Sequence, residues 1–270
     1  MTRFLLFLLA TVTLLPAADT PSLAVFDNGL GRGILSIDDQ AELAHRTGYS
    51  GVMFAGTAHI PEMRSALDQR GLKFLGIYTG MNVSDPQPSF DPGLPEAIRQ
   101  LRGSGAMILF NVNGHNPDGD AIAVRTIQQV ADMAAESGLR VALYPHYGMH
   151  VARIEDALRV REKAGRKNIG IVFNLCHWLR SGDEANLAVR LQQAAPYLYL
   201  VLINGADHEG DWDRLIQPLD RGEFDLAAFL KALHSVDYRG PIGLQCYAIK
   251  GDREENLRRS MAAWKKLAAR

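Results

Sequence analysis

The feature that most constrains this chain is an alternation, repeated after residue 22, between short apolar runs and amphipathic helical patterns. The apolar runs, such as AMILF, IGIVF and LYLVLI, are continuous, which is typical of parallel strands covered on both faces. We expect strands at 23–28, 51–55, 73–79, 106–112, 140–145, 169–174, 198–204 and 241–247. We expect helices at 37–48, 60–71, 93–103, 119–137, 153–164, 184–195, 225–236 and 252–268. These eight βα units predict a single α/β domain, a (β/α)8 TIM barrel over residues 19–270.

Helix-capping residues along the chain support this prediction. Ser36 and Asp225 precede helical patterns as N-caps, Gly165 follows one, and no linker or low-complexity tract interrupts the units. The alternative is a doubly wound open sheet, which would carry a glycine-rich phosphate turn after its first strand. The stretch DNGLGRG at 27–33 lacks the spacing of such a turn.

The N-terminus has a different character. Arg3 is followed by an apolar run over residues 4–15 and then by small residues, the layout of a secretory signal peptide. The run is shorter than the ~20 residues that cross a bilayer as a helix. We therefore expect residues 1–18 to direct export to the periplasm or the extracellular space, with cleavage near Ala17 or Ala18 and no further membrane contact; a buried N-terminal element is the alternative.

Charge and cysteine content narrow the partners. The formal net charge is -1, and the pI of about 6.7 gives no basic excess for nucleic acid. Cys176 and Cys246 fall on expected strands six and eight, further apart than a disulfide allows, so we expect two free thiols. The oligomeric state is left open.

Polar and aromatic residues gather where the expected strands end. In a TIM barrel the carboxyl ends of the strands carry the functional groups. Neutral amides and hydroxyls beside aromatic rings suit a polyhydroxylated ligand, because amides bond sugar hydroxyls and rings cover the apolar sugar face. The candidate substrate-binding residues are Asn111, Asn113, Tyr144, Asn174, Asn204, Asp207, Trp212, Gln245 and Tyr247.

Several of these residues also have a structural explanation. Asn113 precedes a glycine, and Asn-Gly is common in plain turns. The residues after Asp207 would suit a solvated loop, namely His208, Glu209, Asp211 and Asp213, although Trp212 among them needs a surface to cover. Cys176 has no surrounding signature of a nucleophile.

The strand ends resemble the xylose isomerase-like TIM-barrel superfamily, also called sugar phosphate isomerase/epimerase-like. The matching segments are VALYPHYG, FNLCHW, LINGAD, PLDRGEFD and GPIGLQCY, in the family's order. The resemblance implies a divalent metal held by residues that end strands five to eight. In this sequence those four positions become Tyr144, Asn174, Asn204 and Gln245, while two histidines of the pattern are kept as His146 and His177.

Amides and a phenol supply no negative charge for a hard divalent cation. We therefore expect no metal cofactor; a metal held by His146, His177 and Asp207 is the alternative. His146 and His177 are the candidate catalytic acid and base, because histidine titrates near neutral pH.

The sequence predicts an exported carbohydrate-active enzyme that acts on a sugar or keto-sugar. It is isomerase- or epimerase-like, with a lyase as the alternative reaction type. A non-catalytic sugar-binding protein on the same barrel is the alternative. An endonuclease-like role is a weaker third, since its carboxylate and histidine set is missing and the charge does not suit DNA.

Overall fold

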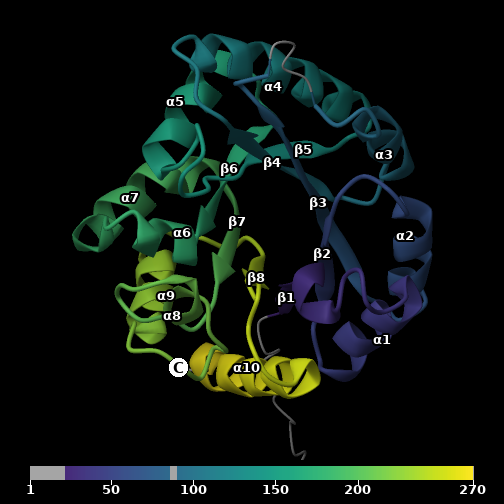
Figure 1. Cartoon of the computed structure of the whole chain (residues 1–270), viewed down its shortest axis with the longest axis vertical. Coiled ribbons are helices and arrows are strands. Elements are labelled where there is room, and N and C mark those ends of the chain that lie inside the picture. Colours follow the sequence, from purple (N-terminus) through teal and green to yellow (C-terminus); the bar gives the residue numbers. More distant parts are fainter. Residues whose placement is uncertain (1–21, 86–89, 270) are drawn as a thin grey trace, which may run out of the picture.

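The computed structural model describes residues 22–85 and 90–269. Within this part of the chain, eight strands close into one barrel in sequence order, and every neighbouring pair is parallel, including β1 with β8 (Figure 1). The strands are β1 (Leu23–Phe26), β2 (Gly51–Ala55), β3 (Lys73–Asn82), β4 (Met107–Asn113), β5 (Arg140–Leu143), β6 (Ile169–Asn174), β7 (Leu198–Ile203) and β8 (Ile242–Leu244). The predicted (β/α)8 barrel is confirmed.

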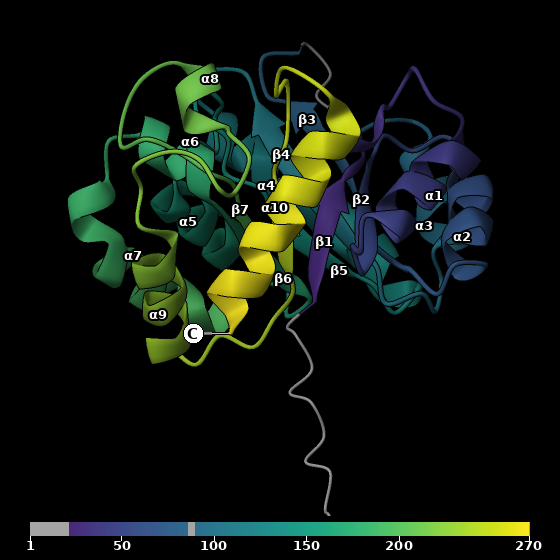
Figure 2. The same ribbon diagram turned by 90° about the horizontal axis from the view of Figure 1, so that it is seen from below.

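Helices surround the barrel and cover its outer face (Figure 1). They are α1 (Ile37–Arg46), α2 (Ile60–Asp68), α3 (Leu94–Gln100), α4 (Gly119–Glu136), α5 (Ile154–Ala164), α6 (Leu175–Arg180), α7 (Leu187–Ala194), α8 (Trp212–Leu215), α9 (Leu226–Ser235) and α10 (Arg253–Ala268). Short 3-10 helices add η1 (Asp27–Leu30), η2 (Glu184–Asn186) and η3 (Ala195–Tyr197). Two helices were not predicted, α6 and α8; Figure 2 shows α8 at the edge of the barrel where the strands end.

The predicted helix boundaries rest on the expected capping bonds. The Ser36 hydroxyl accepts the Asp39 N–H at 3.1 Å, and the Asp225 carboxylate accepts the Ala228 N–H at 2.9 Å. Gly165 follows α5 with φ 62°, the left-handed conformation that glycine adopts without a Cβ clash. These two N-caps and this C-cap are confirmed.

The strand ends differ from the prediction in ways that affect the site. β5 stops at Leu143 and β8 at Leu244, so Tyr144, Gln245 and Tyr247 lie just beyond their strands. β4 runs one residue further than expected, to Asn113. Ladder bonds continue past the assigned ends, because the Gln245 N–H still donates to the Ile203 carbonyl at 2.9 Å. These residues therefore stay at the barrel rim.

Glycines make room for large side chains inside the barrel. A Cβ on Gly170 would lie 2.4 Å from the Tyr199 ring, and one on Gly243 would lie 2.7 Å from the Met53 side chain. Both distances are too short for a real Cβ contact. A side chain at Gly170 would have to displace the Tyr199 ring, whereas one at Gly243 would meet the flexible end of Met53.

Three further expectations concern the termini and the cysteines. The predicted signal segment, residues 1–18, lies outside the described residues. No helix in 22–85 or 90–269 is long and apolar enough to cross a membrane. Cys176 and Cys246 are both buried and form no disulfide, which confirms the two free thiols.

Candidate active site at the carboxyl ends of the strands

The upper interior of the barrel is filled by aromatic rings. Tyr144, directly after β5, is 2% exposed and packs edge-on against Tyr78, with ring centroids 4.9 Å apart, and against Phe26, at 6.5 Å. Phe26 and Tyr78 meet each other at 6.0 Å. The Tyr144 ring is therefore buried and fixed by its two aromatic neighbours.

Two predicted site residues are bonded to that phenol. The side-chain amides of Asn174 and Gln245 both donate to the Tyr144 oxygen, the second at 3.2 Å. The Asn174 oxygen accepts the Cys176 thiol at 3.1 Å, and the Gln245 oxygen accepts the Asn28 amide at 3.4 Å. Burial raises the pKa of Tyr144 well above its usual value, so the hydroxyl keeps its proton. The sequence placed Tyr144, Asn174 and Gln245 at one rim, and the structure brings them into one neutral network.

The two predicted catalytic histidines lie against each other. His146 follows β5 and His177 lies in the first turn of α6, and their ring centroids are 3.8 Å apart at 39°. The Tyr144 ring is 6.5 Å from His146 and 6.2 Å from His177. The pair therefore borders the amide–phenol network.

Burial keeps both imidazoles neutral. It lowers the pKa of His146, and it lowers the pKa of His177 well below the usual 6.5, with the neighbouring His146 as a second cause. His146 Nδ1 donates to the Tyr147 carbonyl at 3.0 Å, which leaves the Nε2 lone pair free. His177 Nδ1 is buried without a hydrogen-bond partner.

Exposed aromatic rings lie beside the histidine pair. The Trp212 ring, which opens α8, meets the His177 ring edge-on at 5.2 Å and the Tyr147 ring at 6.2 Å. Trp212 is 37% exposed and Tyr147 43% exposed. The Arg180 guanidinium lies 5.6 Å from the Tyr147 ring and 5.7 Å from the Trp212 ring. Sequence reasoning missed Arg180, because its place one turn after His177 is visible only once α6 is recognised.

Two predicted residues after β7 serve the loop that carries Trp212. Asn204 is fully buried, and its amide donates to the Gly205 carbonyl at 2.8 Å and to the Leu215 carbonyl at 2.6 Å, while its Oδ1 is buried without a partner. Asp207 accepts the Glu223 N–H at 3.1 Å and pairs with Arg214 at 2.7 Å. Both side chains hold the β7–α8 loop in place.

The remaining predicted site residues, Asn111, Asn113 and Tyr247, make none of the ring contacts described for His146 and His177. The Asn111 amide donates to the Thr79 carbonyl at 3.0 Å. Asn113 is exposed and its oxygen accepts the N–H of Gly114 at 2.7 Å, which is the turn bond considered as its structural explanation. Tyr247 is 63% exposed on the rim.

Asp27 is a buried acid at the end of β1 to which the sequence assigned no role. One oxygen accepts the Ala55 N–H at 3.0 Å and lies 3.4 Å from Arg32, and the other has no partner. Burial raises its pKa from 3.8 to about 6. Burial also raises the pKa of both cysteines to about 12, so neither Cys176 nor Cys246 supplies a thiolate nucleophile at neutral pH.

A family model and a known protein match this chain by sequence. The family model of the xylose isomerase-like TIM barrel matches residues 41–267. The 3-dehydroshikimate dehydratase of Pseudomonas aeruginosa is 26% identical over 179 residues, which are 62% of this chain and 26% of that protein. The chain thus spans about a quarter of that relative's length.

Solved structures of similar shape include sugar epimerases. A D-allulose 3-epimerase from Methylomonas sp. superposes with a TM-score of 0.72 at 18% identity, over 92% of this chain and 98% of that one. A probable 3-DHS dehydratase from Bacillus anthracis gives 0.71 at 12%, over 89% and 97%. A xylose isomerase domain protein from Alicyclobacillus acidocaldarius gives 0.69 at 22%, over 92% and 98%. Because the family model covers well over half of the sequence, the chain belongs to the xylose isomerase-like TIM-barrel family.

Proposed function

We propose that this protein is a carbohydrate-active enzyme that moves a proton at a carbon next to the carbonyl of a sugar or keto-sugar. The observation that carries the proposal is the contact of His146 and His177 at 3.8 Å on the barrel rim. Two neutral imidazoles next to a buried phenol favour acid–base chemistry over simple packing. Burying a polar ring without hydrogen-bond partners costs free energy, and groups with shifted pKa values gather at functional sites.

The hydrogen bonds assign a role to each group. His146 is the base, since its Nε2 carries a lone pair and its lowered pKa leaves that lone pair free at neutral pH. Two amides fill the acceptor sites of the Tyr144 oxygen, so its own hydrogen is left to donate to the substrate's developing oxyanion. Accepting two bonds also makes a hydroxyl a stronger donor.

The spacing of the two imidazole rings limits which reaction types the site can catalyse. A ring contact of 3.8 Å leaves no room for a substrate carbon between the imidazoles, as epimerisation by two opposed bases would need. A substrate that meets both rings from one side suits proton transfer on one face. That means isomerisation, or β-elimination in which His146 takes the α-proton and passes it to the β-hydroxyl, which leaves as water. We therefore place His146 and His177 in an isomerase or dehydratase.

The substrate class follows from the rings and from the relatives. Trp212 and Tyr147 would cover the apolar face of a sugar, with Arg180 beside them. Neighbouring structures are named as complexes with D-allulose and with D-tagatose, and the curated relative is named for 3-dehydroshikimate. All are polyhydroxylated carbonyl compounds.

We also propose that this chemistry runs without a divalent metal. If Tyr144, Asn174, Asn204 and Gln245 stand where the family binds its ion, their donors do not fit one. The Asn174 and Gln245 oxygens are already occupied by N–H and S–H donors, and none of the four is a carboxylate. Within the described ranges, no three His, Cys, Asp or Glu side chains are grouped to hold a metal.

Deuterium exchange tests the enzyme directly. The protein is incubated with D-allulose, D-tagatose or 3-dehydroshikimate in D2O, and loss of the proton next to the carbonyl is followed by NMR. His146→Gln should abolish the exchange while leaving sugar binding measurable by calorimetry. A matched control is His45→Gln, an exposed histidine on α1. Equal exchange rates in His146→Gln and the control would contradict the assignment.

Chelation tests the metal. Activity that survives EDTA supports the proposal. Activity that disappears with EDTA and returns with Mn²⁺ or Mg²⁺ would overturn it. We also propose that residues 1–18 direct export of the protein. N-terminal sequencing of protein recovered outside the cytoplasm should then give a sequence that starts near residue 19.

A non-catalytic sugar-binding protein is the second candidate. The observation that favours it is the closure of Tyr144, Asn174 and Gln245 on one another, which leaves fewer polar groups for a substrate. Sugar binding by the unmodified protein without any deuterium exchange would favour this candidate.

A further inference from the structure

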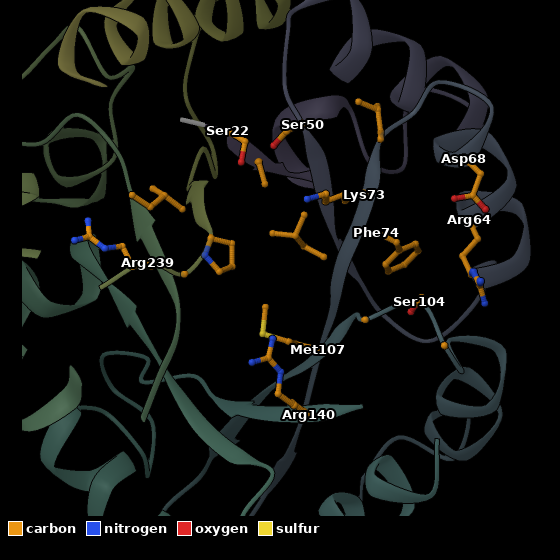
Figure 3. Close-up of a pocket in the computed structure, with 18 residues that line it drawn as sticks. Ser22, Ser50, Arg64, Asp68, Lys73, Phe74, Ser104, Met107, Arg140 and Arg239 are labelled. Carbon is orange, nitrogen blue, oxygen red and sulfur yellow. The ribbon is translucent and has the colours of Figure 1, made fainter. Parts of the chain in front are cut away.

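A second pocket lies at the opposite end of the barrel from the histidine pair. It has a volume of about 670 Å³ and is lined by residues at the amino-terminal ends of the strands, including Ser22, Ser50, Lys73, Met107 and Arg140 (Figure 3). It shares no lining residue with the candidate active site.

The lining carries a strong local charge. Four cations line it, Arg64, Lys73, Arg140 and Arg239, against one acid, Asp68, a net of +3 in a chain whose formal net charge is -1. Concentrated positive charge in a concave site attracts anions.

Two of the four cations are free to bind a ligand. Arg64 donates to the Gln100 carbonyl, and Arg239 pairs with Asp237 at 2.8 Å. Lys73 begins β3 and Arg140 begins β5, two strands separated only by β4, and both side chains turn toward the middle of the pocket (Figure 3). The Arg140 guanidinium lies 4.5 Å over the Tyr199 ring, which orients its plane without using its N–H donors.

We propose that this pocket binds a phosphate-type oxyanion, with Lys73 and Arg140 as the binding residues. A guanidinium offers a two-pronged donor and an ammonium a point charge, the usual pair for phosphate oxygens. The nearby loop leaves space, because a Cβ added to Gly103 or Gly105 would touch nothing within 4 Å.

The phosphate has two possible carriers with the same chemistry. One is a free phosphorylated compound. The other is the headgroup of an anionic lipid. The negative surface potential of anionic lipids attracts basic residues that lie close to it.

The first arm of the test uses pyrophosphate. The full chain is titrated by calorimetry and by thermal unfolding at low ionic strength. K73A/R140A should bind about tenfold more weakly or worse. The matched control, R125A/K231A, removes the same charge from exposed positions on α4 and α9 and should bind like the unmodified protein.

The second arm uses sedimentation with vesicles of phosphatidylglycerol and, for comparison, phosphatidylcholine. If K73A/R140A weakens pyrophosphate binding, the site takes free phosphates. If it weakens only phosphatidylglycerol binding, the site takes lipid headgroups. Either result supports the oxyanion site. If K73A/R140A and R125A/K231A behave alike in both arms, the proposal is overturned. No outcome depends on the activity of the histidine pair.

Discussion

Replacing Tyr144 by phenylalanine tests the polar centre of the barrel most directly. The ring and its packing against Phe26 and Tyr78 are kept, and only the hydroxyl is removed. That hydroxyl is the acceptor for the buried amides of Asn174 and Gln245.

The expected loss can be worked from these two bonds. A buried donor left without an acceptor costs about 1–3 kcal/mol, so two of them should lower the free energy of unfolding by about 2–6 kcal/mol. If Tyr144 also stabilises the oxyanion, the turnover of the folded variant should fall by about 10²–10³.

Urea unfolding followed by tryptophan fluorescence measures the stability. The control is Tyr49→Phe, since the Tyr49 hydroxyl is also buried but donates to a single carbonyl, that of Leu257, at 3.0 Å. Tyr49→Phe should cost about 1 kcal/mol. A Tyr144→Phe variant no less stable than Tyr49→Phe would refute the amide–phenol network as described.

Three further predictions concern pH and packing. Burial raises the pKa of Asp27 from 3.8 to about 6, so the stability that the protonated carboxyl contributes is present below pH 3.8 and is lost as pH rises through 6. Relative to Asp27→Asn, the unfolding free energy of the natural protein should therefore fall by about 2 kcal/mol between pH 4 and pH 7, and a pH-independent difference would contradict this. The pH dependence that His177 contributes has the opposite sign, because burial lowers its pKa: the stability is present above pH 6.5 and is lost as pH falls. His177→Gln should therefore weaken the fall of the unfolding free energy toward acid pH, measured by urea unfolding. An unchanged pH dependence would argue that His177 is not buried as a neutral ring. Gly170→Ala should lower the melting temperature, since its Cβ would lie 2.4 Å from the Tyr199 ring; a variant that melts with the natural protein would show that the ring has room to move.

The barrel could be predicted from the sequence because its signal is local. Continuous apolar runs alternate with helical patterns eight times, and two strands, 51–55 and 169–174, have the predicted boundaries. The helix α6 was missed because its residues, LCHWLR, follow a strand without a turn and have no polar face, so no period marks them as helical. Arg180 was missed as a site residue for the same reason, because it lies on α6.

For the candidate site too, some features could be predicted from the sequence and others depended on the tertiary structure. Sequence position alone placed Tyr144, Asn174, His146, His177 and Gln245 at one rim, because parallel strands in a barrel all end on the same side. Which of them touch was decided by the tertiary structure, since hydrogen bonds and ring contacts between residues 30 to 101 positions apart depend on where the closed sheet turns each side chain. Closure joined the amides to the phenol and the two imidazoles to each other, and it left Asn204 and Asp207 to support a loop.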